Sequence, residues 1–318
     1  MIDGHDADIR PSCGKPLWQA GWPRTQVTAR QAYPGDAMEF GSWRLDVVSG
    51  GNLRMDGGAM FGVVPKPLWE KRTRPDEANR IPMATNCLLA RDGERTLLVD
   101  TGPGGKFDER QREIFALRGG EPLLENLAAL GVSPEDIDTV LLSHLHFDHA
   151  GGATRNVAGR LVPTFPRARH VVQRCEWDAA TSGAAELEGV FPEENLRPLE
   201  ESGLIELIDG DVEIVHGWRS IRTPGHTPGH QSLALSAGRE TTIYMGDVCP
   251  TQAHLSTFWC MAFDLDLLES RRQKAALLGR IADEDALALF CHDPKTHAAR
   301  IRRHSRRDFV VEEAFAEL

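Results

Sequence analysis

The stretch Ser143-His144-Leu145-His146-Phe147-Asp148-His149 places four metal-binding side chains within six positions. It directly follows the apolar run 137–142, which is typical of a short buried strand. Residues two apart point the same way on an extended strand end but in nearly opposite directions on a helix. We therefore expect His144 and His146 to converge, and a loop to bring the aspartate and the third histidine to a second point. Imidazole and carboxylate ligands together favour zinc and similar metals over calcium or magnesium.

Three further metal-binding side chains occupy comparable places. His230 closes a Gly/Pro-rich turn that begins at Thr223, and Asp247 and His292 each follow an apolar, strand-like run. Sheets of α/β proteins present their functional residues just past strand ends. One sheet edge could therefore gather two adjacent metal sites with open coordination positions for water. The turn holds His226 as well as His230, and the residues alone leave open which of the two is the ligand.

These motifs form an ordered set that extends over most of the chain. The histidine-rich stretch, the doubled turn, Asp247, His292 and the earlier Val99-Asp100-Thr101-Gly102 together resemble the metallo-β-lactamase superfamily of metal-dependent hydrolases. The resemblance runs from about Trp43 to His292. It implies an αββα sandwich, an α/β fold in which two mixed sheets pack face to face and helices flank them.

The resemblance also implies the roles of the individual residues. Two divalent metal ions, which we expect to be Zn²⁺, would share Asp247 and a bridging hydroxide that attacks the substrate. The family places the ligand of the doubled turn on the second histidine, so His226 would be structural, and Asp100 would order the metal loop without touching metal. The implied ligands are His144, His146 and His230 for one metal, Asp148, His149 and His292 for the other, and Asp247 for both.

The segment 55–69 suggests a substrate class. It combines a glycine hinge with large apolar side chains, and with Gln231-Ser232 it resembles the quorum-quenching N-acyl-homoserine lactonase branch of the superfamily. We expect an apolar wall near the metals that accommodates an acyl chain, although each of these side chains taken alone could equally be ordinary core. The candidate substrate-binding residues are Met60, Phe61, Trp69 and Phe258.

One position departs from the lactonase pattern. Well-known members carry a tyrosine three residues after the bridging aspartate, where this chain has Pro250. His254 is the nearest substitute as a donor, unless it is an exposed loop histidine. The expected catalytic residues are thus Asp148, Asp247 and His254. The departure keeps hydrolysis of aryl esters, organophosphates or halogenated aromatics as an alternative. A non-catalytic scaffold of the same fold is a separate, third option.

Composition limits the partners. The chain has 318 residues, of which 41% are hydrophobic, so it can bury a large core. A net charge of −11 disfavours nucleic acid, and no apolar run approaches the length of a membrane span. The six cysteines lack a Cys-x-x-Cys spacing, which favours reduced thiols in the cytoplasm. We therefore expect a cytoplasmic enzyme with a small-molecule substrate and a homodimer as a candidate assembly.

The remaining organisation follows from turn residues and periodicity. Residues 1–40 are predicted to be an N-terminal arm and residues 41–318 the hydrolase domain. The arginine cluster at 300–307 is interpreted as the solvated face of a helix. Strands are predicted at 43–49, 83–90 and 95–100, and helices at 123–130 and 267–281.

Overall fold

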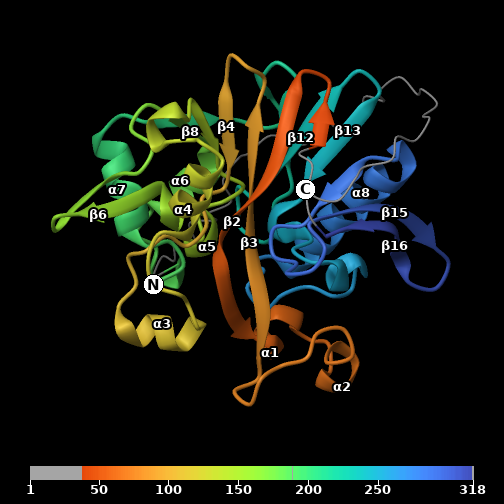
Figure 1. The fold of residues 1–318 in the computed structure, drawn as a ribbon. Helices are drawn as coiled ribbons and strands as arrows, with labels where there is room; N and C mark the ends of the chain where they lie inside the picture. The colour runs from red at the N-terminus through yellow and green to blue at the C-terminus, as the bar shows by residue number, and fades with distance from the viewer. Residues whose placement is uncertain (1–37, 188, 317–318) are drawn as a thin grey trace, which may run out of the picture.

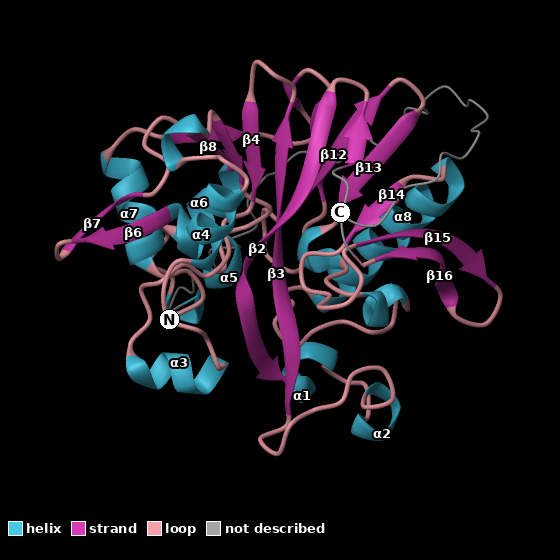
Figure 2. Ribbon diagram, in the orientation of Figure 1, coloured by secondary structure: helices cyan, strands magenta, loops and turns pink. Residues whose placement is uncertain are grey.

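Two large β-sheets pack face to face, and helices cover their outer faces (Figure 1). The structure, a computed structural model, describes residues 38–187 and 189–316. Helices α4 to α7 lie beside the first sheet and α8 beside the second, as Figure 2 shows. The αββα sandwich predicted from the sequence is confirmed. Of the predicted N-terminal arm, residues 1–37 lie outside the described residues, and the last three form strand β1.

The first sheet is mixed and carries the metal loop after its strand β5. Its strands β4, β5, β8 and β9 are parallel, so their carboxyl ends meet at one edge. In sheet order the strands are β1 (Met38–Phe40), β2 (Trp43–Asp56), β3 (Arg80–Arg91), β4 (Thr96–Val99), β5 (Thr139–Leu141), β8 (Arg169–Gln173) and β9 (Ile205–Ile208).

The second sheet is also mixed, and its one parallel pair is β13 with β14. A separate two-stranded sheet pairs β6 (Thr154–Val157) with β7 (Arg160–Pro163). In sheet order the second sheet contains β10 (Glu213–Val215), β11 (Trp218–Arg222), β12 (Gln231–Ala237), β13 (Glu240–Tyr244), β14 (Leu287–Leu289), β15 (Ala298–His304) and β16 (Asp308–Phe315).

The helices are mostly short, and α8 is the longest in the described chain. None of the described helices is both long and apolar enough to cross a membrane. The α-helices are α1 (Gly57–Phe61), α2 (Lys66–Trp69), α3 (Glu109–Phe115), α4 (Pro122–Ala129), α5 (Phe147–Ala150), α6 (Arg174–Ala180), α7 (Glu193–Glu201) and α8 (Leu267–Glu284). The 3-10 helices are η1 (Pro134–Asp136), η2 (Gly151–Ala153), η3 (Ala185–Leu187), η4 (Gly246–Val248) and η5 (Gln252–Leu255).

Apolar side chains fill three layers, and the alternation along each strand decides which layer a residue joins. On β3, Cys87 and Leu89 pack toward the helices of the first sheet, whereas Leu88 packs between the sheets. On β13, Tyr244 lies between the sheets and Ile243 packs toward α8. Both sheets are therefore buried on both faces over their central strands.

The predicted strands and helices are present, with shifted ends, but the arginine cluster was misinterpreted. Residues 300–307 belong to the antiparallel hairpin of β15 and β16 rather than to a helix. Within β15, Ile301 is buried while the neighbouring Arg302 and Arg303 are exposed. Arg303 forms an ion pair with Asp283 on α8.

Close backbone packing holds the metal loop against the loop after β4. The amide of Thr101 donates to the carbonyl of His149 at 2.7 Å, and the amide of Gly152 donates to the carbonyl of Gly102 at 2.8 Å. A Cβ atom at Gly152 would lie 2.1 Å from the Thr101 carbonyl oxygen, so only glycine fits there. The glycine pair that follows the histidine-rich stretch is thus required by the approach of two loops.

We expect the substitution Gly152→Ala to lower the free energy of unfolding by about 1–3 kcal/mol, because the added methyl group overlaps a backbone oxygen. Urea unfolding of the metal-free protein measures this. The control is Gly119→Ala, whose Cβ would be 3.5 Å from the flexible side chain of Arg112. Equal unfolding midpoints for the two variants would contradict the expectation.

Candidate metal centre

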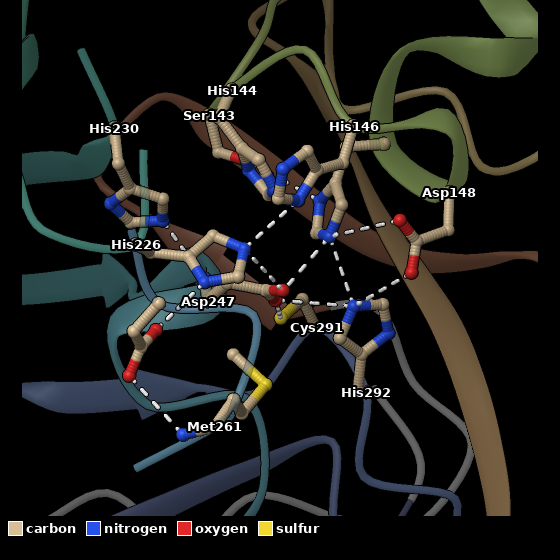
Figure 3. A network of polar contacts seen from close by, with 12 residues as sticks. Ser143, His144, His146, Asp148, His226, His230, Asp247, Met261, Cys291 and His292 are labelled. Atoms are coloured by element: carbon tan, nitrogen blue, oxygen red, sulfur yellow. Dashed lines mark hydrogen bonds and ion pairs between the residues drawn. The ribbon is translucent and has the colours of Figure 1, made fainter. Parts of the chain in front are cut away.

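Histidines and acidic residues from both sheets meet at the edge where the strands end (Figure 3). The first sheet contributes the loop after β5 together with α5, and the second contributes the β11–β12 turn, η4 after β13, and the loop after β14. The local reason is the same in each case. A short strand ends in buried residues, and a polar residue beyond it turns into the space between the sheet edges.

A first donor group consists of three histidines and one carboxylate. The ligand atoms of His144, His146, His226 and Asp247 all lie within 4.8 Å of one another. His226 Nε2 is 3.0 Å from His146 Nδ1 and 3.2 Å from Asp247 Oδ2. His144 Nε2 is buried and has no hydrogen-bond partner. A buried nitrogen without a hydrogen-bond partner, close to two further imidazoles and a carboxylate, is what a metal ion would satisfy.

A second donor group shares the same aspartate. His149, Asp247, Cys291 and His292 offer ligand atoms within 4.8 Å of one another. The Nε2 atoms of His149 and His292 are 2.9 Å apart, and Asp247 Oδ1 is 3.3 Å and 3.1 Å from them. Asp148 Oδ2 lies 3.4 Å from His292 Nε2. Asp247 thus directs one carboxylate oxygen to each group, as a bridging ligand would.

Protein groups behind the histidines fix their orientation. His149 Nδ1 lies 2.7 Å from Asp100 Oδ2, and His292 Nδ1 lies 2.7 Å from the carbonyl oxygen of Ala84. These contacts leave Nε2 of both rings facing the cluster, which is how outer partners orient metal-binding histidines. Asp100 also accepts a hydrogen bond from the amide of Ser143 at 2.7 Å, so it orders the metal loop as the sequence predicted.

Glu176 on α6 joins the two ligand-bearing loops. Its carboxylate accepts hydrogen bonds from the amide of Leu145 at 3.0 Å and from the amide of Gly229 at 2.9 Å. Glu176 is completely buried, and this burial raises its pKa. No motif in the sequence drew attention to this residue, because its role depends on loops that meet only in the folded chain.

The buried histidines and carboxylates of the cluster shift one another's pKa values. Burial, and then the neighbouring imidazoles, hold the pKa values of His144 and His146 well below the ordinary value, so both rings are neutral. Burial also lowers the pKa of His149, but nearby carboxylates, Asp247 first, outweigh it and raise the pKa well above the ordinary value. Burial opposes ionisation of Asp247, yet the surrounding histidines, His292 first, hold its pKa well below the usual range.

The structure places the two histidines of the doubled turn opposite to the expectation. His226 points into the first donor group, whereas His230 lies behind it (Figure 3). His230 Nε2 accepts a hydrogen bond from the amide of Asp247 at 2.9 Å, and its Nδ1 is 2.8 Å from Thr223 Oγ1. Because both ring nitrogens of His230 have protein partners, no lone pair is left for a metal. The other expected ligands all lie in or beside the cluster.

His254 does not occupy the place expected of a catalytic donor. It is fully buried, with Nδ1 2.8 Å from Thr251 Oγ1 and Nε2 2.9 Å from the carbonyl oxygen of Met60. Its ring stacks on Phe61 at 4.8 Å, and burial, then Lys274, lowers its pKa to about 3. Both nitrogens are engaged with the protein, so this ring supports the segment around α1 instead of facing a substrate.

The expected substrate-binding residues are also placed differently. Met60, Phe61 and Trp69 are buried in one apolar cluster that includes Met261, and they do not form an exposed wall. Phe258 is 54% exposed and lies under the guanidinium of an arginine on α8. The partly buried residues that pack around this cluster are Met55, Phe115, Leu117, Phe147, Ala253 and Trp259.

Comparison with known proteins agrees with the fold. A model of the metallo-β-lactamase superfamily matches residues 80–292, which is more than half of the chain. The chain therefore belongs to the metallo-β-lactamase superfamily.

Several relatives share a substantial part of the sequence. An N-acyl homoserine lactonase from a Bacillus species is 33% identical over 171 residues, which are 50% of this chain but only 61% of that protein. The N-acyl homoserine lactonase AttM of Rhizobium radiobacter is 29% identical over 217 residues, or 65% of this chain and 78% of AttM. The crystal structure of a probable metal-dependent hydrolase from Staphylococcus aureus matches with a TM-score of 0.80 and 31% identity, over 88% of this chain and 99% of that one.

We expect His226→Ala to bind about one metal ion per chain, because it removes a ligand of the first donor group. His230→Ala removes only a hydrogen bond to the amide of Asp247 and should keep about two ions. Elemental analysis after dialysis against zinc-containing buffer measures both. Loss of an ion from His230→Ala, with two ions kept by His226→Ala, would support His230 as the ligand, as expected from the sequence.

We expect Asp247→Ala to lose both metal ions, because both donor groups share its carboxylate. The same elemental analysis tests this, with Asp209→Ala as a control for removal of a carboxylate from an exposed ion pair. Retention of two ions by Asp247→Ala would show that this residue is not the bridge.

Proposed function

We propose that this protein is a binuclear metal-dependent hydrolase that opens the lactone ring of N-acyl-homoserine lactones. The observation that carries the proposal is the pair of donor groups that share Asp247. The proposed ligands are His144, His146 and His226 for one metal, Asp148, His149 and His292 for the other, and Asp247 for both. Mixed imidazole and carboxylate donors favour Zn²⁺ over calcium or magnesium.

The bound metals would supply Lewis acidity toward the substrate carbonyl and a strong nucleophile from water at neutral pH. The protein supplies the proton transfer. The side chain of Asp148 is 12% exposed, whereas its neighbour His149 is fully buried, so Asp148 is the carboxylate open to substrate. During attack on the lactone, Asp148 would accept the proton at a carboxylate oxygen and then donate it to the ring oxygen that leaves. Asp247 would stay ionised between its histidines.

An aromatic surface beside the metal loop supports an acyl substrate. Phe147 lies between His146 and Asp148 in sequence and is partly exposed like both of them. Its ring contacts Phe107 at 5.7 Å and Phe115 at 5.1 Å between centroids. We call these three phenylalanines the aromatic wall. It replaces the wall expected from Met60, Phe61 and Trp69, which are buried.

The relatives named N-acyl homoserine lactonase support the same substrate class. The alternative is hydrolysis of an aryl ester, an organophosphate or a halogenated aromatic at the same centre. It is favoured by Pro250 in place of a tyrosine, together with the engagement of both ring nitrogens of His254. A cytoplasmic location and a homodimer stay predictions.

We expect Phe147→Ala and Phe115→Ala to raise KM most for long-chain homoserine lactones, because each buried methylene contributes about 0.8 kcal/mol to binding. Short-chain substrates should be little affected. Steady-state kinetics over a series of acyl chain lengths measures this, with Phe258→Ala as the matched control because that ring lies on the surface. Absence of any chain-length dependence in the native enzyme, combined with turnover of aryl esters or phosphotriesters, would favour the alternative.

A further inference from the structure

A carboxylate outside the expected ligand set contacts one of the proposed metal ligands. Asp264 Oδ1 lies 2.9 Å from His226 Nδ1, and Asp264 Oδ2 accepts a hydrogen bond from the amide of Met261 at 3.2 Å. The side chains of Asp264 and His226 are 4% and 1% exposed. Both oxygens of this buried carboxylate therefore have defined partners.

Backbone hydrogen bonds hold Asp264 in register with the histidine. The amide of Leu265 donates to the carbonyl of His226 at 3.2 Å, and the amide of Asp266 donates to the carbonyl of Gly225 at 2.8 Å. Gly225 has φ +128°, and a Cβ atom there would lie 2.3 Å from the amide nitrogen of Ser270 at the start of α8. The turn that carries His226 is thus fixed to the segment 256–266, which joins η5 to α8.

The other end of this segment is fixed just as firmly. The buried amine of Lys274 donates to the carbonyl of Trp259 at 2.6 Å, and the amide of Ala262 donates to the carbonyl of Ala59 at 2.8 Å. The segment therefore fixes the position of Asp264 relative to His226. These hydrogen bonds do not use the Asp264 carboxylate, so a substitution there would leave the segment in place.

We infer that Asp264 is a positioning residue for the first metal, an inference that rests on the proposed role of His226 as a ligand. Its carboxylate can only accept a hydrogen bond from the ring, so it keeps the proton of His226 on Nδ1. Nε2 then carries the lone pair and faces His146 and Asp247. A carboxylate behind a ligating imidazole also makes that imidazole a stronger donor.

The substitution Asp264→Asn separates this role from packing, because asparagine has nearly the same shape. If its oxygen accepts from the amide of Met261, its amino group faces His226 Nδ1 and drives the ring proton to Nε2. In the other orientation of the asparagine side chain, its amino group faces the backbone amide of Met261, so two donors meet. His226 Nδ1 then donates to a neutral amide oxygen instead of a carboxylate. Either orientation weakens His226 as a ligand.

The test is a titration of metal-free, full-length protein with Zn²⁺ against a competing chelator, together with the visible spectrum of the Co²⁺-loaded protein. Asp264→Asn should weaken one of the two sites by about 10- to 100-fold and change the Co²⁺ spectrum of that site. The second site should keep its affinity. The control is Asp266→Asn, two residues away, whose side chain caps α8 through the amide of Glu269 at 2.9 Å and does not contact His226. This control should bind both ions like the native chain.

Native affinity at both sites in Asp264→Asn, or equal weakening of both sites, would overturn the inference. A loss in Asp264→Asn that Asp266→Asn reproduces would also overturn it, because the effect would then belong to the loop as a whole. The result is independent of the proposed reaction. A protein that binds two ions but opens no lactone would refute the proposed substrate and leave the role of Asp264 intact.

Discussion

Burial of the Asp247 carboxylate is the constraint that the rest of the structure satisfies. A buried carboxylate costs several kcal/mol unless other groups compensate its charge. Here the compensation comes from imidazoles that three separate loops deliver, and each imidazole is held from behind by another polar group. Such a network is complete only when the two sheets keep their relative position. The geometry of the centre therefore depends on the packing between the two sheets.

The fold and most of the donor set could be predicted because their signals are local. Apolar runs that end in a ligand, such as 137–142 before His144, reveal both the strand and the edge at which it stops. The arginines at 300–307 show the limit of such signals. A run of charges was given more weight than the buried Ile301 among them, and a hairpin was taken for a helix.

Features that depend on distant contacts could not be predicted. His226 and His230 stand in the same short Thr-Pro-Gly-His pattern, and only the amide of Asp247 and the hydroxyl of Thr223, brought together by folding, distinguish them. The glycines before Met60 suggested an exposed loop, but side chains of β2, β3 and the segment 253–261 pack against it. This burial depends on the parts of the chain that pack against the segment, so it cannot be predicted from the sequence of the segment alone.

Both sheets contribute proposed ligands. His144, His146, Asp148 and His149 follow a strand of the first sheet, and His226, Asp247 and His292 follow strands of the second. A cation bound at this centre would therefore link the two sheets of the sandwich. By mass action, an ion at one hundred times its Kd stabilises the folded chain by about 2.7 kcal/mol per site. The supply of metal around the protein would then affect the stability of the folded chain as well as its chemistry.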